Sequence, residues 1–155
     1  MEFVLLETER LLLRRFQKED VRQLHLVLSD AEVMRYIEPP FGLEQAKSFV
    51  TSCAERVGCL CLKESGLPIG HVIWHPYMGE SARYELGWIL SRAHWGRGYA
   101  KEISLALIQW AKGQGIEEII LEAVPENGGS IALIEHLGAL YSHTEEGLRV
   151  YTVKI

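Results

Sequence analysis

The hydrophobic residues of this chain change their spacing several times, and the order of the spacings restricts the fold more than any other feature. Apolar residues that alternate with polar ones predict strands, whereas apolar residues three and four positions apart predict helices. The stretches that predict strands are 10–16, 59–63, 69–75, 83–90, 116–124, 140–144 and 148–155. The stretches that predict helices are 18–28, a short one ending at 35, a longer one from about 43, 98–112 and 130–137.

This order of elements has three consecutive strands followed by a strand–helix–strand unit, which predicts an α/β protein with helices on a mixed sheet. No linker rich in Gly, Ser or Pro and no internal repeat divides the chain. We therefore expect residues 1–155 to form a single domain. Open sheets of this kind bind ligands beyond the carboxyl ends of their strands, which directs attention to the crossover between Leu90 and Tyr99.

Charge and composition argue against several partners. The chain has 16 basic and 21 acidic residues, so it lacks the basic footprint of nucleic-acid binding, and we expect no nucleic-acid partner. No apolar stretch reaches the roughly 18 residues of a membrane span. Residues 1–7 do not resemble a signal peptide. We therefore expect a cytoplasmic protein with no membrane partner, in which Cys53, Cys59 and Cys61 are reduced.

Two histidines and two cysteines raise the question of a metal site. His71 and His75 alternate with Ile73 on one predicted strand, and Cys59 and Cys61 precede it. The spacing of a closed four-ligand site is absent, however, and cysteines two apart on a strand are usually core or edge residues. We expect no metal.

The crossover carries two glycines, Gly96 and Gly98, directly before a predicted helix. Glycine lets the main chain approach a ligand closely, and the first amides of a helix have no partner within it. A phosphate group suits such a place, and Arg97 would add positive charge. A tight turn without a ligand explains the glycines equally well, so the residues alone leave both interpretations open. Neither the P-loop pattern nor the dinucleotide fingerprint is present.

The same crossover resembles the acetyl-CoA-binding loop of the GNAT family of N-acetyltransferases, whose pattern is (Gln/Arg)-x-x-Gly-x-(Gly/Ala). The matching residues are Trp95, Gly96, Arg97, Gly98, Tyr99 and Ala100, and Trp95 departs from the usual Gln or Arg. Segments 8–14, 84–88 and 126–138 are similar to the branch that contains the ribosomal-protein N-terminal acetyltransferases. The chain is therefore identified as a member of the GNAT family, while these matches say little about the acceptor.

The resemblance implies a mostly antiparallel sheet of six to seven strands with about four helices, in which strands 83–90 and 116–124 splay apart. Acetyl-CoA is the implied co-substrate. Its pantetheine arm would pair with main chain near Ile89 and Leu90, and its pyrophosphate would bind the loop amides. The implied cofactor-binding residues are Ile89, Leu90, Trp95, Gly96, Arg97, Gly98, Tyr99, Ala100, Asn127 and Ser130.

Acetyl transfer to an amine needs a base, because an alkyl ammonium with a pKa of about 10 must lose its proton before it attacks. Glu85 is the candidate, since relatives often place a carboxylate on that strand; a solvated carboxylate or a partner of Arg83 or Arg92 is the alternative. The departing thiolate needs a proton, and Ile134 stands where many relatives have a tyrosine. Ser130 is the remaining candidate acid, and a helix N-cap is its other, compatible interpretation.

The acceptor is expected near the predicted strand 69–75. The candidate substrate-binding residues are Tyr36, Glu38, Trp74 and His75, and a core or surface position is equally open for each. The resemblance implies direct transfer to a primary amine, on a small molecule or at a protein N-terminus. A monomer and a homodimer that pairs along 148–155 both fit.

Two other functions stay open on the sequence alone. A catalytically silent acyl-CoA-binding module would keep the glycine loop but lack a working acid, and Ile134 keeps that alternative open. A nucleotide-binding α/β domain would need a lysine, serine or acidic set around the glycines, which the sequence does not show.

Overall fold

The computed structural model describes residues 5–155, so residues 1–4, on which part of the signal-peptide expectation depends, lie outside the described residues. The strands are β1 (Leu6–Glu7), β2 (Leu11–Arg14), β3 (Val57–Leu62), β4 (Pro68–Tyr77), β5 (Glu80–Leu90), β6 (Glu118–Ala123), β7 (Leu140–Glu145) and β8 (Leu148–Lys154). The α-helices are α1 (Val21–Leu28), α2 (Ala31–Met34), α3 (Leu43–Ser52), α4 (Tyr99–Ala111) and α5 (Gly128–His136). Two single 3-10 turns span Lys18–Asp20 and Arg92–His94.

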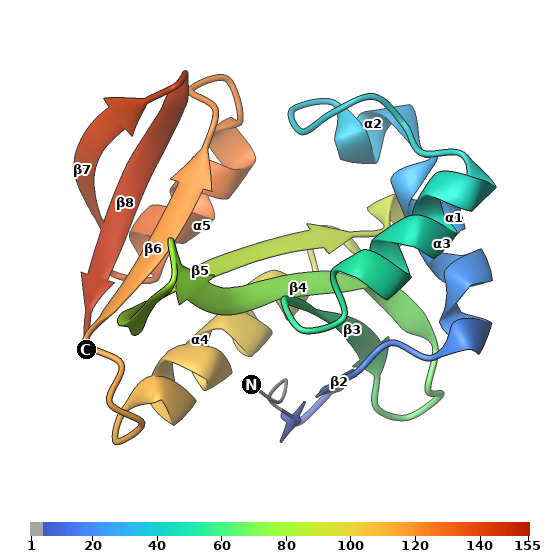
Figure 1. Cartoon of the computed structure of the whole chain (residues 1–155), viewed down its shortest axis with the longest axis horizontal. Helices are drawn as coiled ribbons and strands as arrows, with labels where there is room; N and C mark the ends of the chain where they lie inside the picture. Colours follow the sequence, from blue (N-terminus) through green and yellow to red (C-terminus); the bar gives the residue numbers. More distant parts are fainter. Residues whose placement is uncertain (1–4) are drawn as a thin grey trace.

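The eight strands of the described chain form one sheet in the order β1-β2-β3-β4-β5-β6-β8-β7 (Figure 1). Neighbouring strands are antiparallel except β5 and β6, which are parallel because α4 carries the chain back between them. The mixed, mostly antiparallel sheet is confirmed, with an extra strand because the two residues of β1 are too short to give an alternating pattern. The two edge strands of this sheet are β1 and β7, whereas β8 lies between β6 and β7, so the expected free edge at 148–155 is wrong.

β5 and β6 part after a short parallel contact. Their register runs only from Arg83↔Glu118 to Glu85↔Ile120, while β5 continues to Leu90. In Figure 1 the carboxyl ends of the two strands point in clearly different directions. The splay expected between these strands is thus confirmed.

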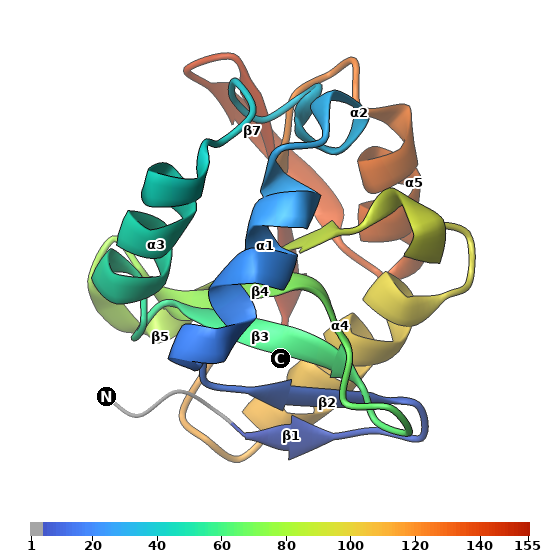
Figure 2. The ribbon, with the colours of Figure 1, turned by 90° about the vertical axis from the view of Figure 1, so that its right-hand side faces the viewer.

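Helices cover both faces of the sheet (Figures 1 and 2). On one face α4 and α5 enclose the larger core, to which β2 contributes Leu11 and Leu13 and α4 contributes Leu107, all fully buried. On the other face α1, α2 and α3 enclose a smaller core. Side chains along β5 alternate between the two, with Leu90 in the first and Ile89 in the second. No helix within residues 5–155 is long and apolar enough to cross a membrane.

Candidate active site

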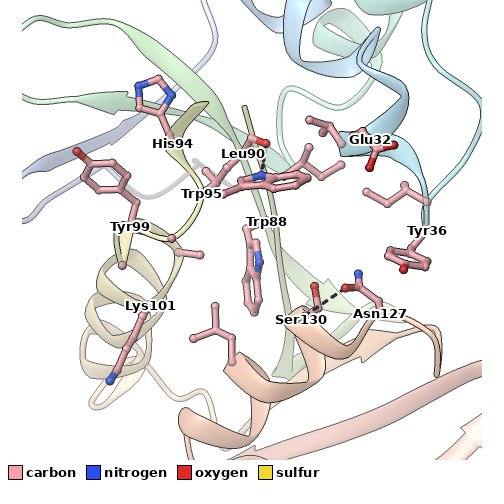
Figure 3. Close-up of a pocket in the computed structure, with 18 residues that line it drawn as sticks. Glu32, Tyr36, Trp88, Leu90, His94, Trp95, Tyr99, Lys101, Asn127 and Ser130 are labelled. Atoms are coloured by element: carbon pink, nitrogen blue, oxygen red, sulfur yellow. Dashed lines mark hydrogen bonds between the residues drawn. The ribbon is translucent and has the colours of Figure 1, made fainter. Parts of the chain in front are cut away.

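A cavity of about 680 Å³ opens where β5 and β6 part (Figure 3). α2 forms one wall, the end of β5 and the crossover loop form the next, and the first turns of α4 and α5 complete it. The cavity brings together every expected cofactor-binding residue except Arg97, whose exposed side chain lies outside the lining. Residues that the resemblance grouped from three separate segments therefore meet in one place.

The crossover loop reaches α4 through two glycines in the left-handed region. Gly96 has a φ of 72° and Gly98 a φ of 79°, which glycine adopts without steric cost. Gly98 is the N-cap of α4, and the Glu102 amide donates to its carbonyl oxygen at 3.0 Å. The amides of Tyr99 and Ala100 have no partner within the helix, and they lie where the helix dipole is positive. This end of α4 is suited to an anion.

The register of β4 and β5 decides which main-chain groups face the gap left by β6. The Ser91 amide donates to the Ile69 carbonyl oxygen at 2.7 Å, and hydrogen-bonded pairs of this kind alternate along antiparallel strands. The main chain of Ile89 therefore pairs with β4, whereas the N–H and C=O groups of Trp88 and Leu90 point into the gap. Of Ile89 and Leu90, only Leu90 therefore turns its main chain toward the gap, while the Ile89 side chain lines the cavity.

Trp95 ties the crossover loop to the end of β5. Its indole N–H donates to the Leu90 carbonyl oxygen at 2.9 Å, and the residue stays 47% exposed beside the cavity (Figure 3). A contact of 2.5 Å between Ser91 Oγ and His94 Nδ1 closes the adjoining turn. Burial and the charge of Arg97 lower the pKa of His94, so its ring is neutral at pH 7. The departure from Gln or Arg at Trp95 thus has a structural role that the sequence did not indicate.

The start of α5 forms the wall opposite β5. Asn127 is its N-cap, and the Asn127 Oδ1 accepts a hydrogen bond from the Ser130 amide at 3.2 Å (Figure 3). The capping role considered for Ser130 is therefore filled by Asn127, and that interpretation of Ser130 is wrong. Ser130 instead lies in the first turn, where it lines the cavity.

Glu85 lies outside the cavity lining, on the face of β5 that also carries Ile89. Its Oε2 is 3.0 Å from Nε2 of His75, the opposite residue on β4. This hydrogen bond raises the pKa of His75 despite partial burial. Nearby, the Tyr77 hydroxyl donates to Glu122 Oε1 at 3.1 Å, and burial raises the pKa of the Glu122 carboxyl.

The arginines considered as partners of Glu85 are engaged elsewhere. Arg83 Nη2 lies 3.1 Å from Oε1 of Glu118, a carboxylate that Lys154 also contacts. Arg92 Nη2 lies 3.2 Å from Oδ2 of Asp30. The interpretation of Glu85 as an arginine partner is therefore wrong, and its partner is a histidine.

The four expected substrate-binding residues do not meet. Tyr36 lines the cavity just after α2, whereas His75 lies outside the lining, on β4 opposite Glu85. Glu38 is exposed and lies outside the lining. Trp74 is 3% exposed in the larger core, where its ring packs edge-on against Trp110. Consecutive strand residues point to opposite faces, so the expectation for Trp74 is wrong.

Several lining residues were not expected from the sequence. They are Glu32, Val33, Ile37, Trp88, His94, Lys101, Gly129 and Leu133. The residues of α2 reach the cavity only through tertiary packing, which no local pattern reports. The sequence position of Lys101 could have indicated it, because a cation in the first helical turn after a glycine loop suits a phosphate ligand.

The cysteines and the possible metal ligands of the described chain were also considered as sites. Cys53, Cys59 and Cys61 are free, and the Sγ atoms of the two buried ones, Cys59 and Cys61, are 3.6 Å apart. Within residues 5–155 no three His, Cys, Asp or Glu side chains are grouped so that they would hold a metal ion.

Comparison with known proteins places this fold and cavity in a family. Residues 10–140 match the family described as "Acetyltransferase (GNAT) domain". The uncharacterized N-acetyltransferase YnaD of Bacillus subtilis (strain 168) is 34% identical over 137 residues, 84% of this chain and 79% of that protein. The crystal structure of a GNAT-family acetyltransferase from Bacillus anthracis is similar with a TM-score of 0.90 and 27% identity, covering 97% of this chain and 98% of that one. A spermidine N-acetyltransferase from Vibrio cholerae, solved with CoA and spermine, shares the fold with a TM-score of 0.77, 17% identity and coverage of 95% and 96%.

The chain belongs to the GNAT acetyltransferase family. It is an acyl-CoA-dependent N-acetyltransferase, which transfers an acetyl group from acetyl-CoA to an amine. This finding excludes the nucleotide-binding domain considered from the sequence, and it favours an active enzyme over the silent module.

Proposed function

We propose that the cavity is the acetyl-CoA site and that the pantetheine arm lies along the free edge of β5. One observation carries the proposal: the main-chain groups of Trp88 and Leu90 face a gap that Asn127 closes on the other side. The amides of pantetheine match such donors and acceptors. Trp95 uses one lone pair of the Leu90 carbonyl oxygen, and the second is available to a ligand amide.

The pyrophosphate of CoA is assigned to the glycine loop and the first turn of α4. The left-handed Gly98 presents its amide without a Cβ in the way, and a Cβ there would meet only Arg10 Nη2 at 3.5 Å. The unpaired amides of Tyr99 and Ala100 continue this anion site into the helix. Lys101 follows these amides in the first turn of α4, but its exposed side chain is directed away from the loop (Figure 3).

The acceptor amine is proposed to reach the thioester from the face of β5 that carries Glu85. Glu85 removes a proton from the ammonium, the amine nitrogen bonds to the thioester carbon, and the carbon–sulfur bond breaks. Ser130 donates its hydroxyl proton to the departing thiolate, and the second proton that the attacking nitrogen loses restores the hydroxyl. Two positions support these roles: Glu85 is the last residue of β5 paired with β6, and Ser130 lines the opposite wall of the cavity.

The acceptor is proposed to be a primary amine on a small molecule or a protein N-terminus. Tyr36 and Glu32 line the cavity beside α2, and a carboxylate there favours a cationic group. We further propose a cytoplasmic protein of one domain, monomeric or homodimeric; its single continuous sheet supports the domain assignment.

Calorimetric titration with acetyl-CoA, with ATP and NAD as controls, tests the co-substrate site. We expect saturable binding of acetyl-CoA alone, and no binding by a folded sample would contradict the assignment. Thiol release is then measured with spermidine and with peptides that begin with Ser or Ala. Glu85→Gln should keep the acetyl-CoA affinity and lower kcat by about a hundredfold or more. An unchanged kcat would remove Glu85 from the proposed role.

A further inference from the structure

The hydrogen bonds of His75 fix where its protons lie. Its Nδ1 is 2.8 Å from the main-chain oxygen of Pro76, and its Nε2 is 3.0 Å from Oε2 of Glu85. A carbonyl oxygen only accepts, so Nδ1 carries a proton. Nε2 then faces a carboxylate, and two acceptors in contact repel each other unless a proton lies between them. The arrangement is therefore stable when one proton is shared by Nε2 and Oε2.

We infer that His75 is a positioning residue for Glu85: the two side chains share one proton, and the pair accepts the proton of the acceptor amine only after the shared proton has left. This inference rests on the proposed role of Glu85 as the base. We expected His75 to contact the substrate. The His75 ring instead contacts Glu85 and lies outside the cavity lining, so His75 would act on the substrate only through Glu85.

The surroundings of the pair favour the shared proton. Arg56, before β3, acts on the His75 ring, and Glu85 acts on Tyr77 of β4 and on Glu122 of β6. On β7, Glu145 acts on Tyr77 and Glu122, and His143 acts on Glu122. Arg56 opposes a charge on the ring, whereas the carboxylates add negative charge on the side of Glu85. The bond to Glu85 outweighs both burial and Arg56, and the pKa of His75 is raised above its ordinary value of 6.5.

The shared proton sets the pH range in which Glu85 acts as a base. With that proton in place, the Glu85 oxygen that faces His75 is occupied by the shared hydrogen bond. After the shared proton has left, Glu85 can take a proton from the acceptor ammonium, and this proton is again shared between Glu85 and His75. The amine lone pair that is set free forms the new bond to the thioester carbon. Activity should therefore rise with pH through a midpoint above 6.5, the ordinary value for histidine, and not through the value of about 4.3 of an isolated carboxyl group.

NMR titration of the imidazole protons tests the shared proton without any acceptor. The His75 signal is assigned as the one that His75→Gln removes, and the exposed His136 serves as internal reference. We expect His75 to titrate above pH 6.5 in the wild type and at a clearly lower pH in Glu85→Gln, where only the bond to the Pro76 oxygen still raises the pKa while burial and Arg56 lower it. The same His75 midpoint in both proteins would overturn the inference.

Kinetics then separate a positioning role from simple packing. His75→Gln keeps an amide that can donate a hydrogen bond to Glu85, but this amide does not ionise. His75→Ala removes the hydrogen bond as well as the ionisable group. With spermidine or a peptide that begins with Ala as acceptor, kcat rises with pH on the acidic side of its profile. The midpoint of this acidic limb should shift to a lower pH by about one unit or more in His75→Gln. His136→Gln is the matched control that leaves the limb in place.

The two possible failures give different results. If Glu85→Gln lowers kcat but His75→Gln keeps the wild-type limb, the shared proton is wrong and the base assignment stands. If Glu85→Gln turns over at the wild-type rate, the base assignment itself is wrong, whatever His75 does.

Discussion

The indole N–H of Trp95 donates to the main-chain carbonyl oxygen of Leu90 at 2.9 Å, which joins the glycine loop to the free edge of β5. The two parts of the proposed site, the edge for pantetheine and the loop for pyrophosphate, are thereby held at a fixed distance. A ligand that bridges both parts benefits from this, because less of the loop has to be ordered on binding.

Trp95→Phe should weaken acetyl-CoA binding by about fivefold, since it removes one hydrogen bond worth about 1 kcal/mol while keeping most of the ring. Calorimetric titration measures the change, and the thermal unfolding midpoint shows that the fold is intact. Tighter binding by Trp95→Phe would mean instead that the indole competes with the ligand for the Leu90 carbonyl oxygen.

Gly98→Asp should abolish measurable acetyl-CoA binding, because it adds strain at a φ of 79° and places a negative charge beside the phosphates. Gly113→Asp is the matched control: its φ is 85°, it lies at the other end of the same helix, and nothing lies within 4 Å of an added Cβ. Gly98→Ala separates strain from charge, and its loss should be smaller. Equal affinity in Gly98→Asp and Gly113→Asp would contradict the loop assignment.

Local patterns predicted the part of the site that depends on local conformation. Gly96 and Gly98 were expected at a phosphate-suited turn, and both have positive φ at the start of α4. Asn127 and Ser130 were expected beside the same ligand from the family resemblance and not from a local pattern, and both line the cavity. At the glycines a short run of residues fixes its own main chain, so the sequence carries that information directly.

Sequence reasoning failed where the answer depended on which face a strand residue takes. Trp74 and His75 were both assigned to the acceptor side, although neighbours on a strand point to opposite faces. Because helices cover both faces of this sheet, β4 is buried on both and shows no clean alternation. The contribution of α2 and the histidine partner of Glu85 likewise depend on tertiary packing and strand register.

His71 should make the protein less stable as the pH falls. The ring is 2% exposed, and burial lowers its pKa to about 4, whereas the unfolded chain takes up the proton near 6.5. The stabilising effect of a neutral ring is complete above 6.5 and is lost as pH falls from there towards 4. Between pH 7 and pH 5 this contributes a loss of about 2 kcal/mol.

Urea unfolding of the wild type and His71→Leu at both pH values measures this effect. The difference between the two pH values should be smaller in the variant by about that amount. His136→Leu, a substitution at an exposed histidine, is the control that should keep the wild-type difference. If His71→Leu unfolds with the same pH dependence as the wild type, the ring is accessible to protons in the folded state.

Glu118→Gln should loosen the closed end of the β5–β6 pair. Glu118 is 8% exposed and its carboxylate bonds to Arg83 and Lys154. Because Arg83 is partly exposed and Lys154 is largely exposed, the loss is limited to about 1 kcal/mol. Glu44→Gln removes a surface pair with Lys47 and should cost nothing measurable. Urea unfolding compares the two, and equal stability of both variants would show that the network does not hold the strands.

Ser130→Ala and Asn127→Ala should separate catalysis from capping. The cap bond runs from the Ser130 amide to the Asn127 side chain, so Ser130→Ala keeps it and should leave the unfolding free energy unchanged. Asn127→Ala removes the cap and should cost about 1 kcal/mol. If the Ser130 hydroxyl protonates the thiolate, Ser130→Ala lowers kcat by about tenfold or more with unchanged acetyl-CoA affinity. Thiol release, calorimetry and urea unfolding give the three values, and a wild-type kcat in Ser130→Ala would assign the thiolate's proton to another donor.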